Sequence, residues 1–299
     1  SFKEKTYYRI INLFFYMSTL KESKNKDIPW VEKYRPTHFD NIVLDPKYFM
    51  ISTGISDNDF QNLKDIMNIV ECNWICIDIA NGYIDNLCNF CKKVREEFPT
   101  KIIIAGNVVT REIVEELILN GKVDGVKVGI GPGSACTTRL KTGVGMPQLS
   151  AILECADAAH GVGGHIIADG GITCPGDMAK AFGAGADFVM MGGQFAGHDQ
   201  NPGELITENK NKYKLFYGMS SSKAQEKQYG KMEKYRSSEG RGVKIPYKGD
   251  LKDTVDDYLG GLRSTCTYIN AENIKNITKC TTFVKVSQQL NTIYYNNSL

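Results

Sequence analysis

The sequence predicts an α/β protein of the (β/α)8-barrel type, because strand-like and helix-like segments alternate along most of it. Short apolar runs rich in β-branched residues are separated by stretches in which apolar residues recur at helical spacing. This alternation is typical of βαβ units and a parallel sheet. The predicted strands are Tyr48–Ser52, Trp74–Ile79, Ile102–Gly106, Val126–Gly129, His165–Asp169 and Phe188–Gly192. The predicted helices include Asp59–Val70, Tyr83–Phe98, Arg111–Asn120 and Gln148–His160.

Small and polar residues follow several of these strands, which favours a barrel over an open doubly wound sheet. Asp78 ends one strand, Asp169-Gly170-Gly171 follows another, and Gly192-Gly193 follows the last. A (β/α)8 barrel keeps its active site at the carboxyl ends of its strands and often binds phosphate at the last two loops. Only six strands are predicted where a barrel has eight.

Composition excludes several classes of function. The net charge of +2, from 36 basic and 34 acidic residues, gives no sign of nucleic-acid binding through bulk electrostatics. The longest apolar run near the start, Ile10–Met17, is too short to span a bilayer. Nine cysteines with irregular spacing and no signal peptide indicate free thiols in a reducing compartment. We therefore expect a soluble cytoplasmic protein with no nucleic-acid or membrane partner.

Two segments depart from the strand–helix alternation. Residues 1–46 show no clean period, and within them IPWVEKYRPTHFDNIVLDP resembles the opening of clamp-loader small subunits. No GxxxxGK[ST] phosphate loop follows, so we predict a non-family, irregular segment at 1–46 and a barrel domain at 47–299. The polar stretch Gln194–Gly249 is too long for an ordinary connection and predicts an active-site flap. Chain from Asp250 onward is expected to supply closing helices.

The stretch VGIGPGSACTTR, Val128–Arg139, is the strongest candidate for chemistry. Its alternating glycines allow positive φ and a concave arrangement of peptide groups for an anion or a cation. Cys136 follows this turn at the carboxyl end of a predicted strand. A thiol beside N–H dipoles and a cation such as Arg139 favours the nucleophilic thiolate. The alternative is a glycine-rich turn with a buried structural cysteine.

The other cysteines and the histidines give weaker indications of a functional site. Cys72, Cys76, Cys88 and Cys91 have spacing that resembles a zinc site. However, Cys76 lies within an apolar strand, and the next two cysteines lie on the following predicted helix, so we expect no zinc. His160, His165 and His198 are dispersed and show no metal-ligand spacing.

Several motifs together resemble the GMP reductase family from about Lys47 to Leu290. They are GIGPGSACTTR, ADGGITCPGDMAKAFGAGADFVMMGG, YGMSS, YRSSEG, IPYKGD and GGLRSTCTY. The related IMP dehydrogenases share the cysteine loop but carry an inserted pair of regulatory domains, and no segment here is long enough to be one. Compared with the family, the chain lacks the first two barrel strands, including a lysine that helps to hold nicotinamide.

The resemblance implies an activity, a cofactor and a set of site residues. The family reduces GMP with NADPH to IMP and ammonia, is usually a homotetramer, and binds a monovalent cation, expected to be potassium. Cys136 would attack the purine C2 to give a thioimidate, with Thr138 and Glu239 moving the proton. The implied substrate-binding residues are Ser134, Asp169 (on the ribose hydroxyls), Gly170, Gly171, Gly192, Gly193, Gly218, Met219, Ser220, Arg236, Ser237, Ser238 and Gly240. The implied NADPH contacts are Asp78, Ile79, Ala80, Ile130, Gly131, Tyr235, Arg236, Ser264, Thr265, Cys266 and Thr267, and the implied cation ligands are the backbone carbonyls of Gly131, Gly133, Cys136 and Arg139.

Two alternatives remain beside this function. One is an inactive pseudoenzyme, or a mis-joined chain that only associates or misfolds, because binding residues of the first two strands have no counterpart. The other is an IMP dehydrogenase, within the same enzyme class.

Overall fold

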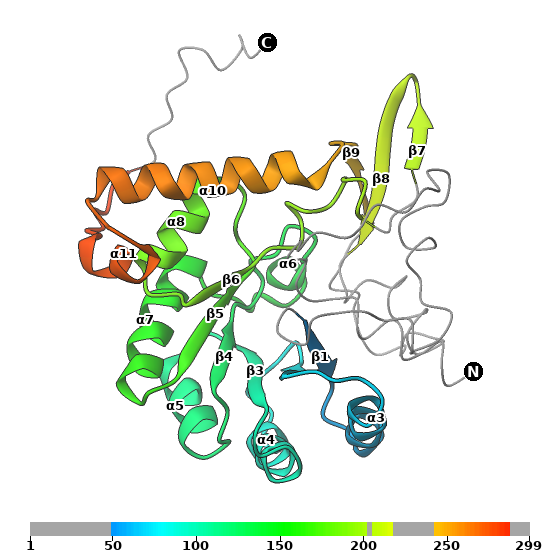
Figure 1. Cartoon of the computed structure of the whole chain (residues 1–299), viewed down its shortest axis with the longest axis vertical. Helices are drawn as coiled ribbons and strands as arrows, with labels where there is room; N and C mark the ends of the chain where they lie inside the picture. Colours follow the sequence, from blue (N-terminus) through cyan, green and yellow to red (C-terminus); the bar gives the residue numbers. More distant parts are fainter. Residues whose placement is uncertain (1–48, 202–204, 218–241, 288–299) are drawn as a thin grey trace.

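A parallel six-stranded sheet forms the centre of the molecule (Figure 1). The computed structural model describes residues 49–201, 205–217 and 242–287. The strands pair in chain order, so each strand lies beside the strand that precedes it in the sequence. They are β1 (Met50–Thr53), β2 (Trp74–Asp78), β3 (Ile102–Val108), β4 (Gly125–Val128), β5 (His165–Asp169) and β6 (Phe188–Met190). The predicted number of barrel strands is confirmed.

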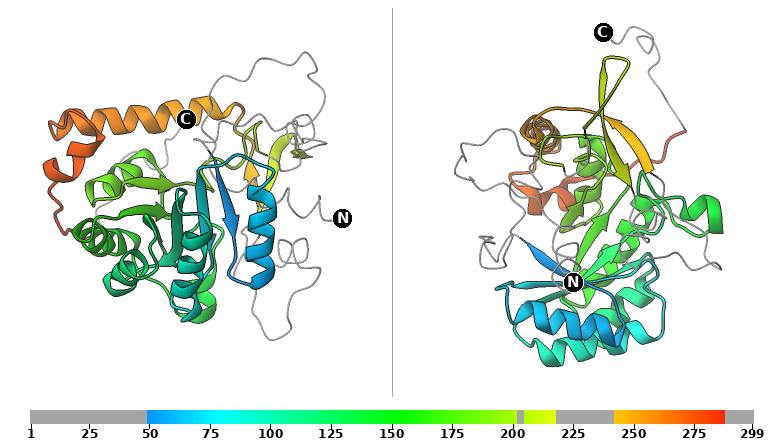
Figure 2. Two further views of the ribbon diagram at one scale, coloured as in Figure 1. Left: turned by 60° about the horizontal axis from the view of Figure 1, so that its bottom comes forward. Right: turned by 90° about the vertical axis from the view of Figure 1, so that its right-hand side faces the viewer.

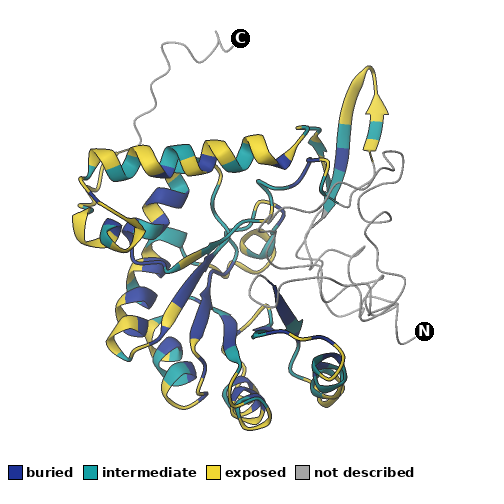
Figure 3. Cartoon of the chain, in the orientation of Figure 1, coloured by how far each residue is buried: buried dark blue, intermediate teal, exposed yellow. Residues whose placement is uncertain are grey.

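Helices cover one face of this sheet, as βαβ connections require (Figures 1 and 2). Their sheet-facing sides are buried and their outer sides exposed, which gives the striped colouring of Figure 3. The helices are α3 (Asp57–Met67), α4 (Asn86–Glu97), α5 (Arg111–Leu119), α7 (Gln148–Gly161) and α8 (Pro175–Gly183). The main core, which includes Ile75, Ile103 and Val126, lies between these helices and the sheet.

The other face of the sheet is concave. Met50, Cys76, Ile104 and Ile167 form a small buried cluster there, each from a different strand. The rings of Trp74 on β2 and Phe188 on β6 meet edge to face with centroids 6.4 Å apart, although three strands separate β2 from β6 in the sheet. The sheet is therefore curled as in a barrel wall, which confirms the barrel-type fold over the doubly wound alternative.

Several element boundaries differ from the predicted ones. The helix predicted from Tyr83 begins only at Asn86, with Asp85 as its N-cap. The Tyr83 hydroxyl instead contacts Thr110 and the backbone N–H of Val109. The last strand ends at Met190, before the predicted Gly192. Two helices were not predicted from the sequence: the short α6 (Thr138–Thr142), which follows the glycine loop, and α8. The chain after Asp250 forms α10 (Leu251–Tyr268), packed on α8, and α11 (Ile274–Cys280).

The expected flap is partly built as a second, antiparallel sheet. Strands β7 (Leu205–Glu208), β8 (Asn211–Tyr217) and β9 (Gly242–Pro246) pair in that order and stand to one side of the main sheet (Figure 1). The centre of the flap and residues 1–46, for which an irregular segment was predicted, lie outside the described residues. Among the described helices, none has the length and apolar character that crossing a membrane would require.

Candidate active site

Cys136 lies on the loop between β4 and α6, at the carboxyl end of the sheet. The backbone N–H of Cys136 donates to the carbonyl of Gly133 at 3.0 Å, which closes the turn. The thiol donates to the hydroxyl oxygen of Thr138, the first residue of α6, at 3.2 Å. Cys136 is neither buried nor fully exposed, unlike the buried cysteines of the core. The geometry thus joins the predicted nucleophile to one of the two predicted proton-transfer groups.

The loops after β5 and β6 pack against the cysteine loop. A Cβ added at Gly170 would lie 3.1 Å from Pro132, and one added at Gly193 would lie 2.4 Å from the Ser134 hydroxyl. Gly170 and Gly171 have φ of +83° and +78°, a conformation that side chains disfavour. These contacts bring together loops that are far apart in the sequence.

A small hollow of about 60 Å³ lies between the three loops. Its lining consists of Pro132, Ser134, Gly170, Gly171, Ile172, Thr173, Met190, Met191, Gly192 and Gly193. None of these side chains is charged, so an anion held here would be bound by backbone N–H groups and hydroxyls. The predicted substrate-binding glycines on these loops are therefore placed together.

A buried lysine joins two carboxylates beside this hollow. The ammonium of Lys127 lies 2.8 Å from Asp78 Oδ1 and 2.8 Å from Asp169 Oδ2. Burial alone would lower the pKa of Lys127, but the attraction of Asp169 and Asp78 outweighs it and raises the pKa above its ordinary value. The lysine is therefore charged. We call this unit the Asp78–Lys127–Asp169 bridge.

Two amide side chains brace Asp169 and the β4 end. The Asn107 amide donates to Asp169 Oδ2 at 2.9 Å and to the carbonyl of Gly129 at 2.7 Å. A register shift in β3 around Asn107 accompanies this arrangement, and such bulges often re-aim a side chain beside a site. The Gln148 amide donates to the carbonyls of Val128 and Asp169 at 2.9 and 3.2 Å. The acceptor oxygens of both amides are buried and have no hydrogen-bond partner among the described residues.

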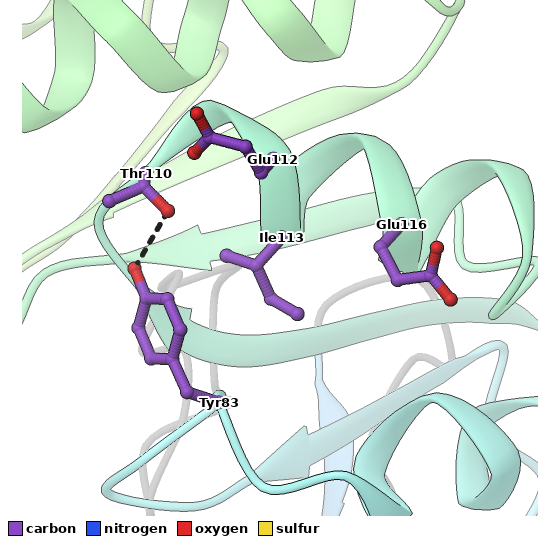
Figure 4. A pocket seen from close by; sticks show the side chains of 5 residues that line it. All are labelled: Tyr83, Thr110, Glu112, Ile113 and Glu116. Atoms are coloured by element: carbon purple, nitrogen blue, oxygen red, sulfur yellow. Dashed lines mark hydrogen bonds between the residues drawn. The ribbon is translucent and has the colours of Figure 1, made fainter.

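A second, open groove lies beside α5, and Figure 4 shows it from close by. Its lining is Tyr83, Thr110, Glu112, Ile113 and Glu116, and no predicted site residue is among them. The Tyr83 hydroxyl points to Thr110 at 3.1 Å, so this contact belongs to the structural join between the ends of β2 and β3. Hydrogen bonds from Asn120 and Cys88 lower the pKa of Glu116. We place the candidate active site at the hollow and the Cys136 loop.

The structure does not bring every predicted residue to this site. The residues Ser264, Thr265, Cys266 and Thr267 lie in the last turns of α10, where Thr265 and Thr267 donate to carbonyls of their own helix. No described hydrogen bond or ion pair links them to the Cys136 loop. Predicted residues that lie outside the described part are Gly218, Met219, Ser220, Tyr235, Arg236, Ser237, Ser238, Glu239 and Gly240.

The cysteine quartet with zinc-like spacing is distributed over β2, α4 and the loop before β2. Cys72 donates to the carbonyl of Trp74 at 3.2 Å, and Cys88 donates to Glu116 at 3.3 Å. Burial raises the pKa of Cys91 to about 12, so that thiol stays protonated. In the described part of the chain, no group of three or more His, Cys, Asp or Glu side chains could hold a metal ion.

Sequence reasoning missed Lys127, Asn107 and Gln148 as members of the site. The sequence did contain an indication of Lys127, because this lysine stands between apolar neighbours in the strand GVKVG, at an inward position. A lysine is rarely buried in this way unless it is paired. Asn107 directly follows the predicted strand end Gly106. Gln148 had no comparable signal, since a glutamine at a helix start is ordinarily exposed.

Comparisons with known proteins identify the family to which this chain is similar. The family described as "IMP dehydrogenase / GMP reductase domain" matches residues 19–291. GMP reductase of Caenorhabditis elegans is 59% identical over 245 residues, which cover 82% of this chain and 68% of that protein. GMP reductase 2 of Homo sapiens is 57% identical over 249 residues, covering 83% of this chain and 71% of that protein.

A solved structure is similar as well. It is a Cys-to-Ala variant of GMP reductase from Trypanosoma brucei in complex with guanosine 5'-monophosphate, with a TM-score of 0.76 and 32% identity. The match covers 90% of this chain and 56% of that chain, so this chain spans little more than half the length of the solved protein. The matched region includes the curled sheet and the cysteine loop described above. The chain belongs to the IMP dehydrogenase / GMP reductase family.

Proposed function

We propose that this chain is a GMP reductase, which reduces GMP with NADPH to IMP and ammonia. The observation that carries the proposal is the thiol of Cys136 hydrogen-bonded to Thr138 beside an uncharged, glycine-lined hollow. The relatives at 57–59% identity are GMP reductases, and the solved relative is described as a complex with GMP.

In the first step, the Cys136 sulfur forms a bond to the purine C2 and the C2 amine leaves as ammonia, giving a thioimidate. The thiol must lose a proton and the amine must gain one. Thr138 accepts a hydrogen bond from the thiol, so its hydroxyl is placed to relay that proton. Glu239, beyond the described residues, is the second group in this proposal. NADPH, when bound, would supply the hydride to C2, and the C2–S bond would then break to release IMP and return the Cys136 thiolate.

The nucleotide would be held by Asp169 and the glycine loops. Asp169 uses Oδ2 for Lys127 and Asn107, and in the described part Oδ1 accepts no hydrogen bond. That oxygen is available to a ribose hydroxyl. Gly171 and the Gly192–Gly193 loop line the hollow without side chains, so a phosphate can approach their backbone N–H groups closely. The N–H of Gly170 donates instead to the carbonyl of Met190 at 3.3 Å, which ties the two loops together.

The residues present fit NADPH at the end of β2. Asp78 is one-third exposed at the mouth of the sheet, and Oδ2 of Asp78 has no partner among the described residues. Its neighbour Ile79 is fixed by two backbone hydrogen bonds of 2.9 Å, donated to Gly106 and accepted from Asn107. We propose that Asp78–Ala80 and Ile130–Gly131 hold the nicotinamide half, with Arg236 as a phosphate contact.

The cysteine loop also suits a monovalent cation. The carbonyls of Gly133 and Arg139 each accept one backbone N–H, from Cys136 and Gly143, which leaves a second lone pair on each. The Arg139 side chain packs against Gly131, where an added Cβ would lie 2.9 Å from Arg139 Nε, and it donates to the carbonyl of Met146 at 2.5 Å. We propose that these carbonyls, with those of Gly131 and Cys136, bind potassium. The proposal also includes a homotetramer and a cytoplasmic location, and both rest on the family resemblance alone.

The test is a spectrophotometric assay on the full chain. We expect GMP-dependent loss of NADPH absorbance, formation of IMP, and release of one ammonia per NADPH. Omission of potassium should slow the reaction. Reduction of NAD by IMP in place of this reaction would identify an IMP dehydrogenase, and binding of GMP without turnover would identify a pseudoenzyme.

A further inference from the structure

The Asp78–Lys127–Asp169 bridge joins two groups that serve different ligands in the proposed function. Asp169 is assigned to the ribose of GMP and Asp78 to NADPH, and Lys127 contacts both carboxylates at 2.8 Å. We propose that Lys127 is a positioning residue, which fixes these carboxylates relative to each other and so aligns the nucleotide with the nicotinamide. This inference rests on the proposed function.

Lys127 acts through its two partners, because it has almost no exposed surface. Its side chain is 4% exposed, whereas those of Asp78 and Asp169 are 33% and 24% exposed. A ligand at the mouth of the sheet can thus reach the carboxylates. The ammonium lies beneath them, at an inward position of β4.

The bridge leaves one oxygen of each carboxylate for a ligand. Lys127 binds Oδ1 of Asp78 and Oδ2 of Asp169. In the described part of the chain, the remaining oxygen of each aspartate accepts no hydrogen bond. A carboxylate held at one oxygen has a fixed plane, so its other oxygen points in a defined direction. This arrangement orients two acceptors at once from a single buried cation.

The surrounding strands are shaped to admit the lysine. A Cβ at Gly106 on β3 would lie 2.7 Å from the Cβ of Lys127 and 2.5 Å from its carbonyl oxygen. Cys76 on β2 is the third titratable group that interacts with the ammonium. Burial raises the pKa of Cys76, so it remains a neutral thiol and cannot replace a carboxylate as counter-ion.

Removing the ammonium should disturb both ligands at once. Two partly buried carboxylates would then face each other without a cation, which favours their separation or protonation. A residue with a purely structural role would lower stability without this paired effect on two ligands. The paired effect is therefore the property to measure.

The experiment compares Lys127→Met, Lys127→Arg and Lys214→Met in the full chain. Lys214 is the matched control, because it is also buried (7% exposed) but, within the described part of the chain, it donates to the backbone carbonyls of Asp199 and Asn201 and to no carboxylate. We expect Lys127→Met to raise KM for GMP and KM for NADPH by roughly tenfold or more each. Lys127→Arg should recover most of this loss, and Lys214→Met should leave both KM values within about twofold of the parent.

Unfolding measurements test the bridge without relying on activity. Lys127→Met should lower the thermal midpoint by roughly 10 °C. The double variant Asp78→Asn/Lys127→Met should lose clearly less thermal stability than the two single variants lose together, because Asp78→Asn already removes one partner of Lys127. We expect the same non-additive loss of stability when Asp169→Asn takes the place of Asp78→Asn in this comparison.

The outcomes separate this inference from the proposed function. If the parent chain consumes no NADPH with GMP, the proposed function fails, and the unfolding cycles alone decide whether the bridge is real. If the parent is active, an unchanged KM for either ligand in Lys127→Met overturns the inference. Additive changes in the thermal midpoint of the double variants overturn it as well. Increases in KM for Lys214→Met that equal those for Lys127→Met also overturn it.

Discussion

A methyl group added at Gly106 should destabilise the protein, because the backbone of β4 occupies the space that it needs. The added Cβ would lie 2.5 Å from the carbonyl oxygen of Lys127 and 2.7 Å from its Cβ. Both obstacles belong to the neighbouring strand and not to the flexible end of a side chain. Gly106→Ala therefore forces β3 and β4 apart at the carboxyl end of the sheet.

The size of the effect follows from overpacking in a strand pair. One extra methyl in a well-packed interior costs about 1–3 kcal/mol. For a domain of this size that corresponds to a midpoint lower by roughly 3–10 °C. Since the displacement acts at Lys127, we also expect Gly106→Ala to raise KM for GMP and NADPH in the same direction as Lys127→Met.

Thermal and urea unfolding measure the stability, with Gly260→Ala as the control. Gly260 lies inside α10, and a Cβ there would meet no atom within 4 Å. Replacing a helical glycine by alanine in open space should stabilise by about 0.5–1 kcal/mol. The two substitutions are chemically identical and should have opposite signs. A Gly106→Ala protein as stable as the parent would refute the assigned close approach of β3 and β4.

Three further predictions concern the catalytic residues. Cys136→Ala should reduce turnover below about a hundredth of the parent rate while GMP still binds, and a faster rate would exclude covalent catalysis by this thiol. Glu239→Gln should lower turnover roughly 100-fold with little change in GMP affinity, as measured by equilibrium binding, and an unchanged rate would leave Glu239 as a solvated carboxylate. Asp169→Asn should raise KM for GMP by roughly 10-fold or more, because one ribose acceptor and the partner of Lys127 are both weakened, whereas an unchanged KM would remove Asp169 from the ribose site.

The sheet was predictable because each of its strands carries its own local signal. Runs such as Trp74–Asp78 and Ile102–Val108 are rich in β-branched residues and bounded by polar residues. Strands of a parallel sheet that are buried on both faces have this near-continuous apolar pattern. The strand ends were less certain, since Phe188–Met190 stops where paired residues run out and not where apolar residues do. The short helix α6 has no buried residue, so it had no hydrophobic pattern to reveal it.

The candidate site was predictable where a motif fixes local geometry. The glycine spacing around Cys136 and the Asp169-Gly170-Gly171 turn determine their loops directly, and the structure places these loops together. The Asp78–Lys127–Asp169 bridge depends instead on the register of three strands, which no local pattern states. A one-residue slip of β4 would turn Lys127 to the opposite face of the sheet. Long-range pairing therefore decides which charged residues meet.

The loop that carries Gly170 and Gly171 is tied to α8 by Asp177, and this tie should depend on pH. Asp177 Oδ2 accepts hydrogen bonds from the backbone N–H of Thr173 at 3.1 Å and from its hydroxyl at 2.6 Å. Burial alone would raise the pKa of Asp177, but the Thr173 hydrogen bonds and Lys180 outweigh it, so the pKa is lowered from its ordinary value.

A lowered pKa in the folded state means that ionised Asp177 stabilises the fold. This contribution is fully present above the ordinary aspartate pKa of about 4 and is lost as the pH falls through the lower folded value. Asp177→Asn should therefore unfold at lower urea than the parent at pH 7, and the difference should shrink as the pH falls below about 4. Thr173→Val removes the hydroxyl donor, so it should move the pKa of Asp177 back toward its ordinary value and weaken the same pH dependence. A stability difference between Asp177→Asn and the parent that stays constant from pH 7 to the acid limit would show that the tie holds equally well with a neutral carboxyl, and that charge has no part in fixing the glycine loop to α8.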